Sequence, residues 1–90
     1  MKEKRDKMQI IYDILASIVD KRGRIKPTHL LYKSNLSHGR LMHYVEELLK
    51  KEFIAKDFDE NERYYTITDK GHVFLAEYKR MREFAESFGL

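Results

Sequence analysis

Apolar residues in the first part of the chain recur at the spacing of an α-helix. They are Met8, Ile11, Ile14, Leu15, Ile18 and Val19. With Asp6 as its N-cap and Gly23 as its stop, this pattern predicts a helix over about 6–21. Pro27 suits the first turn of a second, short helix, because its missing N–H would have no hydrogen-bond partner there. We expect this second helix to end near Ser34.

A tight turn is predicted between the second helix and a third. Asn35 tolerates the left-handed backbone conformation, and Ser37 can cap the next helix by accepting a backbone N–H bond. In the third helix, over about 37–51, the apolar residues share one face. They are Leu41, Val45, Leu48 and Leu49. The opposite, outward face carries Gly39, Arg40, His43, Glu47 and Lys50.

The pattern changes after the third helix. The segments FIAKDF and RYYTIT are rich in β-branched and aromatic residues and flank a polar loop, Asp59-Glu60-Asn61, so they predict a two-stranded hairpin. Thr68 can then cap a fourth helix. Its apolar positions alternate steps of four and three up to the end of the chain, which gives a stripe with a period of about 3.5 residues. The stripe comprises Phe74, Tyr78, Met81, Ala85 and Phe88.

Length and composition restrict the class of protein. Ninety residues, with 42% hydrophobic and 37% charged side chains, fit one folded domain and exclude a disordered chain. No apolar run approaches about 18 residues, so we expect no membrane span. The sequence has no cysteine, and its start, MKEKRDK, does not resemble a signal peptide. We therefore expect a cytoplasmic protein.

The distribution of charge is more informative than the formal net charge of +3. Residues 21–51 carry an excess of +6, because eight bases there oppose only Glu46 and Glu47. The bases are Lys21, Arg22, Arg24, Lys26, Lys33, Arg40, Lys50 and Lys51. Residues 52–63 carry −3, because five acids oppose Lys56 and Arg63. A basic middle therefore precedes an acidic hairpin.

Three helices, the second and third joined by a short turn, followed by a hairpin, are the element order of a winged helix-turn-helix. The stretch from Ile25 to Gly71 resembles small archaeal winged-helix DNA-binding proteins and transcription regulators. The resemblance rests on LLYKSNLSHGRLMHYVEELLKKEFI, the aromatic strand and YTITDKGHVFL. It implies an α+β, mostly helical fold with a three-helix core, a β-hairpin wing and a long C-terminal helix. We expect a winged helix-turn-helix DNA-binding domain over residues 1–70 and a C-terminal helix over 69–90, which is the dimerisation element of the same domain.

The resemblance implies that the third helix lies in the major groove of double-stranded DNA. The expected contacts are Ser37, His38, Gly39, Arg40, His43 and Tyr44. Arg40 can pair bidentately with guanine or bind a phosphate, and Gly39 lets the backbone approach closely. Glu47 lies on the same outward face, and its carboxylate would meet mostly acceptors and phosphate in the groove. We therefore expect contact with DNA to fade after Tyr44. The flanking residues Arg24, Lys26 and Lys33, together with Lys21 and Arg22, are expected to bind the DNA backbone, and each such contact costs affinity as salt rises.

The predicted wing carries four carboxylates against Lys56 and Arg63. They belong to Asp57, Asp59, Glu60 and Glu62. Because phosphates repel carboxylates, we expect the wing to stay off the DNA or to contact it only through its basic ends.

The stripe of the fourth helix has two interpretations. It could fold back on the first helix and close the core of a monomer. Phe74 and Leu75 suffice for that core, however, whereas Met81, Phe84 and Phe88 extend two turns further, where a small domain has little surface left to cover them. The sequence therefore favours a homodimer. In the family that the chain resembles, this helix commonly pairs as an antiparallel coiled coil.

Other chemistries find little support. The four histidines lack metal-ligand spacing, and adjacent Ser37 and His38 point about 100° apart on a helix, so they form no nucleophile pair. We expect no metal, no cofactor and no enzymatic activity, and nothing indicates a small-molecule effector. Two alternatives to a transcription regulator stay open. One is an abundant, weakly specific nucleoid protein, and the other is a protein-interaction module that uses its acidic wing.

Overall fold

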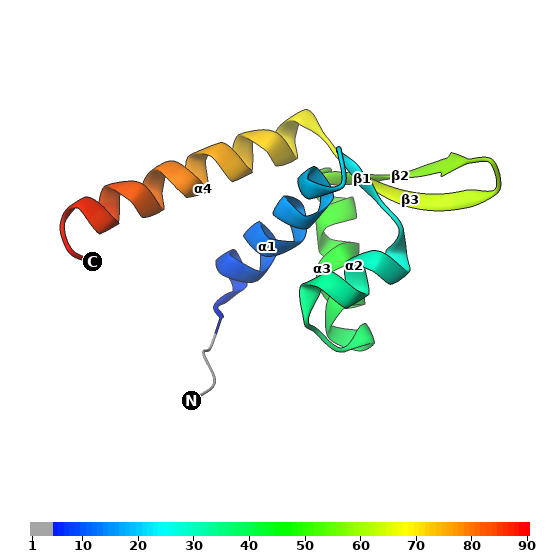
Figure 1. Ribbon diagram of the computed structural model, residues 1–90, viewed down its shortest axis with the longest axis horizontal. Helices are drawn as coiled ribbons and strands as arrows, with labels where there is room; N and C mark the ends of the chain where they lie inside the picture. The colour runs from blue at the N-terminus through cyan, green and yellow to red at the C-terminus, as the bar shows by residue number, and fades with distance from the viewer. Residues whose placement is uncertain (1–4) are drawn as a thin grey trace.

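The computed structural model describes residues 5–90, which form four helices and three short strands. The elements are α1 (Lys7–Asp20), β1 (Arg24–Ile25), α2 (Pro27–Ser34), α3 (His38–Lys50), β2 (Ile54–Asp59), β3 (Glu62–Ile67) and α4 (Asp69–Ser87). The strands form one antiparallel sheet in the order β1-β3-β2. This is the predicted α+β fold of a helical body, a wing and a long last helix (Figure 1).

The predicted helix starts are confirmed. The Asp6 carboxylate accepts a hydrogen bond from the backbone N–H of Gln9 at 2.8 Å, and Pro27 opens α2. The Ser37 hydroxyl accepts from the N–H of Arg40 at 3.3 Å. These contacts satisfy N–H groups that the first turn of a helix leaves without a partner. Local sequence thus determines where these three helices begin.

The ends of α1 and α3 share one geometry, which differs in detail from the prediction. Gly23 was expected to stop α1, but the left-handed conformation begins at Arg22, with φ 64°, and continues at Gly23. The Gly23 N–H donates to the carbonyl of Ile18 at 2.9 Å. At the end of α3, Glu52 also has φ 64°. Both ends are Schellman motifs, which satisfy the last carbonyls of a helix.

The wing contains a strand that the sequence pattern did not predict. Instead of a two-stranded hairpin, three strands pair, because Arg24 lies opposite Thr66 and Ile25 opposite Tyr65. The turn between β2 and β3 consists of Glu60 and Asn61, both with positive φ, as in a type I′ hairpin turn. A two-residue strand has no hydrophobic periodicity of its own, so only its pairing reveals it.

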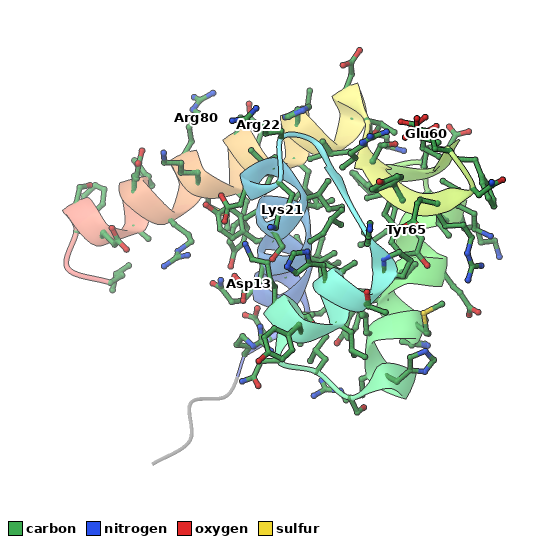
Figure 2. All side chains as sticks on the ribbon, turned by 45° about the vertical axis from the view of Figure 1, so that its right-hand side comes forward. Asp13, Lys21, Arg22, Glu60, Tyr65 and Arg80 are labelled. Atoms are coloured by element: carbon green, nitrogen blue, oxygen red, sulfur yellow. The ribbon has the colours of Figure 1, made fainter. Side chains whose placement is uncertain are left out.

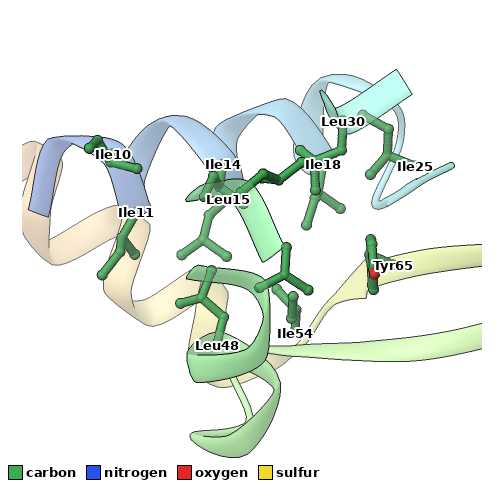
Figure 3. Packing of buried hydrophobic residues seen from close by; sticks show 12 residues of the cluster. Ile10, Ile11, Ile14, Leu15, Ile18, Ile25, Leu30, Leu48, Ile54 and Tyr65 are labelled. Atoms are coloured by element: carbon green, nitrogen blue, oxygen red, sulfur yellow. The ribbon is translucent and has the colours of Figure 1, made fainter. Parts of the chain in front are cut away.

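The hydrophobic core lies between α1, the helix-turn-helix and the sheet (Figure 3). Its fully buried members include Ile14, Leu15, Ile18, Leu30, Val45, Leu48 and Ile54. On β3, Tyr65 is buried whereas its neighbour Tyr64 is only partly buried, because successive residues of a strand point to opposite faces. This core fixes α3 with one face inward and the opposite face exposed.

Helix α4 and the wing extend in opposite directions from the helical body (Figure 1), and the molecule measures 48 × 31 × 22 Å. The first half of α4 packs on this body: the ring of Tyr78 lies 5.2 Å from that of Tyr12. The second half leaves it, with Met81 57%, Phe84 67% and Phe88 68% exposed. Folding back on α1 therefore accounts for only the first half of the stripe.

The joint between the wing and α4 is tightly packed around Gly71, which is buried. A Cβ at this position would overlap the carbonyl oxygen of Phe53 and lie 2.7 Å from Cγ1 of Ile67. The Thr68 hydroxyl accepts from the N–H of Gly71 at 3.1 Å and lies 2.7 Å from the carbonyl oxygen of Glu52. The predicted cap of α4 is thus confirmed, and it also ties α4 to the end of α3.

Candidate nucleic-acid interface

The first turn of α3 is an exposed corner of the molecule. His38, Gly39 and Arg40 are exposed, as is His43 one turn later. The ring of Tyr44 lies 5.8 Å from that of His43 and is half-buried against the core. A Cβ built on Gly39 would have no atom within 4 Å among its described neighbours. The structure therefore exposes His38, Gly39, Arg40 and His43 at the start of α3, whereas Tyr44 beside them is half-buried.

Arg40 is the cation at the centre of this corner. Among residues 5–90, no carboxylate lies within 4.0 Å of its guanidinium, and Lys50 on the same helix is likewise without an ion pair. The described residues therefore supply no partner for a surface ion pair with Arg40. Its five N–H donors are available to an incoming acceptor.

Glu47 is placed differently from the prediction. It was expected on the open face of α3, but its side chain is 24% exposed and pairs with Lys7 of α1 at 3.0 Å and with Lys51 at 3.4 Å. The hydrogen bond from Lys7 holds the pKa of the Glu47 carboxyl below its ordinary value. Its charge is therefore compensated within the molecule.

Two of the flanking bases that were predicted to bind the DNA backbone, Arg24 and Lys26, pair with carboxylates of the wing. Arg24 lies 3.1 Å from Asp59, and its guanidinium stacks over the Tyr64 ring at 4.1 Å. Lys26 lies 2.8 Å from Glu62. The hydrogen bonds that Arg24 and Lys26 donate to Asp59 and Glu62 raise the pKa of both bases above their ordinary values.

Three further bases also lie in different settings from Arg40. Lys33 lies 3.5 Å from Asp20. Lys21 and Arg22 lie at the end of α1 (Figure 2). The carbonyl of Gly23 in this turn accepts from the N–H of Ile67, beside the end of β3. The basic middle of the sequence is thus not one basic surface.

The wing separates its charges between two faces, since neighbouring residues of a strand point to opposite sides and directly paired residues to the same side. We call the side toward α3 the inner face. The register assigns Lys56, Phe58, Arg63 and Tyr65 to the inner face. The same register assigns Asp57, Asp59, Glu62 and Tyr64 to the outer face, where Arg24 and Lys26 pair with the carboxylates.

Because of these ion pairs, the wing is less acidic than its own sequence suggests. The four acids of residues 57–62 are balanced by two bases of the hairpin and by Arg24 and Lys26. Counted together with Lys26, the three-stranded sheet therefore carries no net charge. Of its four acids, Glu60 at the tip (Figure 2) is the one that forms no ion pair within residues 5–90.

Sequence reasoning missed one prominent side chain on α2. Tyr32 is 88% exposed, and Thr28 and His29 on the same helix are also exposed. In a helix-turn-helix the first helix crosses the DNA backbone, and a tyrosine hydroxyl is a common phosphate donor. Helical spacing could have indicated this exposure, because Tyr32 lies about 200° around the helix from the buried Leu30.

Across the described residues, no group of three or more histidine, aspartate or glutamate side chains is arranged to hold a metal ion. No helix within residues 5–90 is both long and apolar enough to cross a membrane.

Similarity to known proteins defines the class of the chain. Residues 4–86 match the family described as winged helix-turn-helix, and the chain belongs to this family. An uncharacterized protein of Methanocaldococcus jannaschii is 38% identical over 72 residues, which cover 80% of this chain and 31% of that protein. The chain therefore spans about a third of that relative's length.

Solved structures share the fold at low sequence identity. Sso10a-2, a DNA-binding protein from Sulfolobus solfataricus, is similar with a TM-score of 0.78 and 20% identity, over 93% of this chain and 85% of that one. F93 from STIV, a winged-helix DNA-binding protein, has a TM-score of 0.76 and 17% identity, over 89% and 92%. TubR bound to 24 bp of tubC from Bacillus thuringiensis has a TM-score of 0.68 and 17% identity, over 80% and 81%.

Proposed function

We propose that the chain is a transcription regulator that binds double-stranded DNA as a homodimer and places α3 in the major groove. The observation that carries this proposal is the exposed first turn of α3, in which Arg40 has no ionic partner among the described residues. Three of the flanking bases, Arg24, Lys26 and Lys33, are instead paired with carboxylates. The positive charge of Arg40 therefore remains available on the helix that we propose enters the groove.

Each part of this corner has a role in the proposed complex. Arg40 pairs with guanine or with a phosphate, and His38 lies at the helix N-terminus, which attracts phosphate. Gly39 brings the backbone close to the DNA, because no side chain stands between them. Tyr32 and Lys33 of α2 bind the adjacent backbone, where contacts set position and not sequence preference.

The structural neighbours support DNA binding. Sso10a-2 and F93 are described as DNA-binding proteins, and TubR is described in complex with DNA. Because their identities to this chain are 20% or less, they support the fold and the general mode of binding and say nothing of the DNA sequence.

The exposed second half of α4 supports the dimer. Phe84 and Phe88 contact each other with ring centroids 5.1 Å apart, and both are exposed together with Met81. A second copy of α4 would cover them, and the heptad-like stripe of Phe74, Tyr78, Met81, Ala85 and Phe88 suits an antiparallel coiled coil.

The two alternatives lose support from the charge distribution. A protein-interaction module that uses an acidic wing needs exposed carboxylates, but most of those in the wing are paired. A nucleoid protein that ignores sequence needs many free cations, because its affinity comes from neutralised phosphates. Here three of the five flanking bases, Arg24, Lys26 and Lys33, each have an acidic partner, which lowers the number of free cations.

The proposal is tested by fluorescence anisotropy of a labelled duplex of about 30 base pairs, titrated with protein at several salt concentrations. We expect Arg40→Ala to weaken binding by about 1 to 3 kcal/mol. Arg82→Ala removes an exposed arginine of α4 and serves as the matched control, with little expected change. Failure of the folded wild-type protein to bind at low salt, or equal effects of the two substitutions, would contradict the proposal.

A further inference from the structure

A cavity of about 300 Å³ lies between α3 and the inner face of the wing. Its helix wall includes His38, Met42 and Leu49, and its sheet wall includes Lys56 and Phe58. This volume is at the lower end of the range for small-molecule sites. Of these residues, the function proposed above uses only His38, and it leaves the rest of the cavity without a role.

The lining of the cavity is mostly apolar and aromatic. Met42 and Leu49 of α3 line it and are half-buried, and the buried Tyr65 of β3 lines it from the sheet. Phe58 lines its outer end and is 69% exposed in the single chain. An aromatic side chain exposed at the edge of a hollow can cover a flat ligand on one face.

Two cations lie in the sheet wall of this cavity. Lys56 and Arg63 are on the inner face of the wing and form no ion pair within residues 5–90. The strand register explains this, since the carboxylates of the hairpin project from the outer face and pair with the β1 region. Glu46 is the one carboxylate among the described lining residues, so the walls carry a net positive charge.

We propose that this cavity binds a small aromatic carboxylate. The ring would lie between the apolar helix wall and Phe58, and the carboxylate would accept hydrogen bonds from Arg63 and Lys56, an arrangement in which arginine binds bidentately. A ring with one acidic group matches both the shape and the charge of the walls. The sequence alone indicated no such ligand, because its two walls come from segments that meet only in the fold.

Binding in this cavity would affect the proposed DNA complex, and this part of the inference rests on the proposed function. His38 belongs both to the cavity wall and to the first turn of α3. A bound anion would also occupy Lys56 and Arg63, the bases of the wing that could otherwise approach a phosphate. We therefore expect the ligand and DNA to compete.

The site is tested first without DNA, by two-dimensional ¹H–¹⁵N NMR of the full chain titrated with 2-naphthoate. We expect saturable shifts at Met42, Lys56 and Arg63 with a Kd on the order of 1 mM or tighter. Two probes separate the parts of the ligand: 2-naphthol retains the ring without the carboxylate, and inorganic phosphate retains charge without the ring. Each should bind at least about tenfold more weakly than 2-naphthoate.

Substitutions then locate the site. Arg63→Met and Lys56→Met should each weaken 2-naphthoate binding about tenfold, whereas Lys79→Met, on exposed α4, should leave it unchanged. Absence of saturable shifts with folded protein would overturn the proposal, as would phosphate binding equal to that of 2-naphthoate. Unchanged affinity in both cavity variants would place the ligand elsewhere and would also overturn it.

Competition is measured by adding 2-naphthoate to the anisotropy titration. We expect the apparent Kd for DNA to rise for the wild type and to rise much less for Arg63→Met. An unchanged Kd for DNA, with the ligand shown to be bound by NMR, would overturn the competition. If the chain binds 2-naphthoate but no DNA, the proposed function fails while the ligand site stands, so the two failures are distinguishable.

Discussion

The starts of α3 and α4 are built from the same residue types but are used differently. Each has a hydroxyl N-cap, Ser37 or Thr68, and each has a glycine in its first turn, Gly39 or Gly71. A Cβ at Gly71 would collide with Phe53, whereas a Cβ at Gly39 would meet no described atom within 4 Å. Packing therefore requires a glycine at position 71 but not at position 39.

This difference indicates where function constrains the sequence. Glycine lowers the stability of a helix relative to alanine, and at Gly71 close packing explains why it is present. At Gly39 the folded chain offers no such reason. A local departure from good helix-forming sequence without a structural reason is typical of a functional surface, and Gly39 lies beside Arg40 on the corner that we propose meets DNA.

We expect the largest effect on stability at the start of α4, where Gly71 is tightly packed. Gly71→Ala should lower the free energy of unfolding by about 3 kcal/mol, because the added methyl forces the carbonyl of Phe53 and the side chain of Ile67 apart. Urea denaturation followed by circular dichroism measures this. If Gly71→Ala lowers the free energy of unfolding no more than an exposed substitution does, the joint can relax around the added methyl group. The contrast between the two glycines would then disappear.

The two caps should also differ. Thr68→Ala should cost about 2 kcal/mol, because it removes the cap of Gly71 and the bond to the carbonyl of Glu52 or Phe53. Ser37→Ala should cost about 1 kcal/mol, since it removes a single exposed cap bond. Both values come from the same denaturation experiment. Equal losses would mean that the tie between α4 and the end of α3 contributes nothing to stability.

At the open start, Gly39→Ala should have opposite effects on folding and binding. The free energy of unfolding should rise by up to about 1 kcal/mol, because alanine favours the helix. DNA affinity should fall about tenfold, since a methyl group would separate the backbone from the duplex. Denaturation and anisotropy on the same preparation measure both. A stabilised variant with unchanged affinity would show that the backbone does not approach DNA at Gly39.

The smallest expected effect is on stability and concerns Glu47, near the end of α3. Because the pKa of Glu47 is lowered in the folded state, its carboxylate stabilises the fold above its unfolded pKa, about 4.3. This contribution is lost as the pH falls through the lower, folded value. Glu47→Gln should therefore be less stable than the wild type at pH 7 and equal to it in stronger acid.

Denaturation curves from neutral to acid pH, at low and high salt, measure this difference. Glu60→Gln, which changes a carboxylate at the tip of the wing, is the control and should alter stability little. A constant difference between Glu47→Gln and the wild type at every pH would exclude the ion pair with Lys7 as its cause.

The fold was largely predictable because its signals are local. The caps at Asp6, Ser37 and Thr68 and the turn at Asn35 depend on neighbouring residues, and all four are confirmed. Strand β1 was missed because two residues carry no periodic pattern, and their structure is imposed by β3, far along the chain.

The candidate site was predictable only in part. Helical spacing correctly exposed Arg40 and His43, because the core face of α3 is clear in the sequence. The partners of Arg24 and Lys26 were not predictable, because they depend on how β1 pairs with β3 and on which way each wing residue then points. The roles of these residues toward DNA stay predictions.

The pairing of β1 with β3 also affects the order in which the chain can fold. The helices and the β2–β3 hairpin form between residues close in sequence, which is fast. Strand β1 must instead find Thr66 and Tyr65, almost half the chain away, and closing such a loop costs more entropy. During synthesis, β1 emerges well before its partner strand. We therefore expect the third strand to join last, so that the rate of refolding depends on a strand of only two residues.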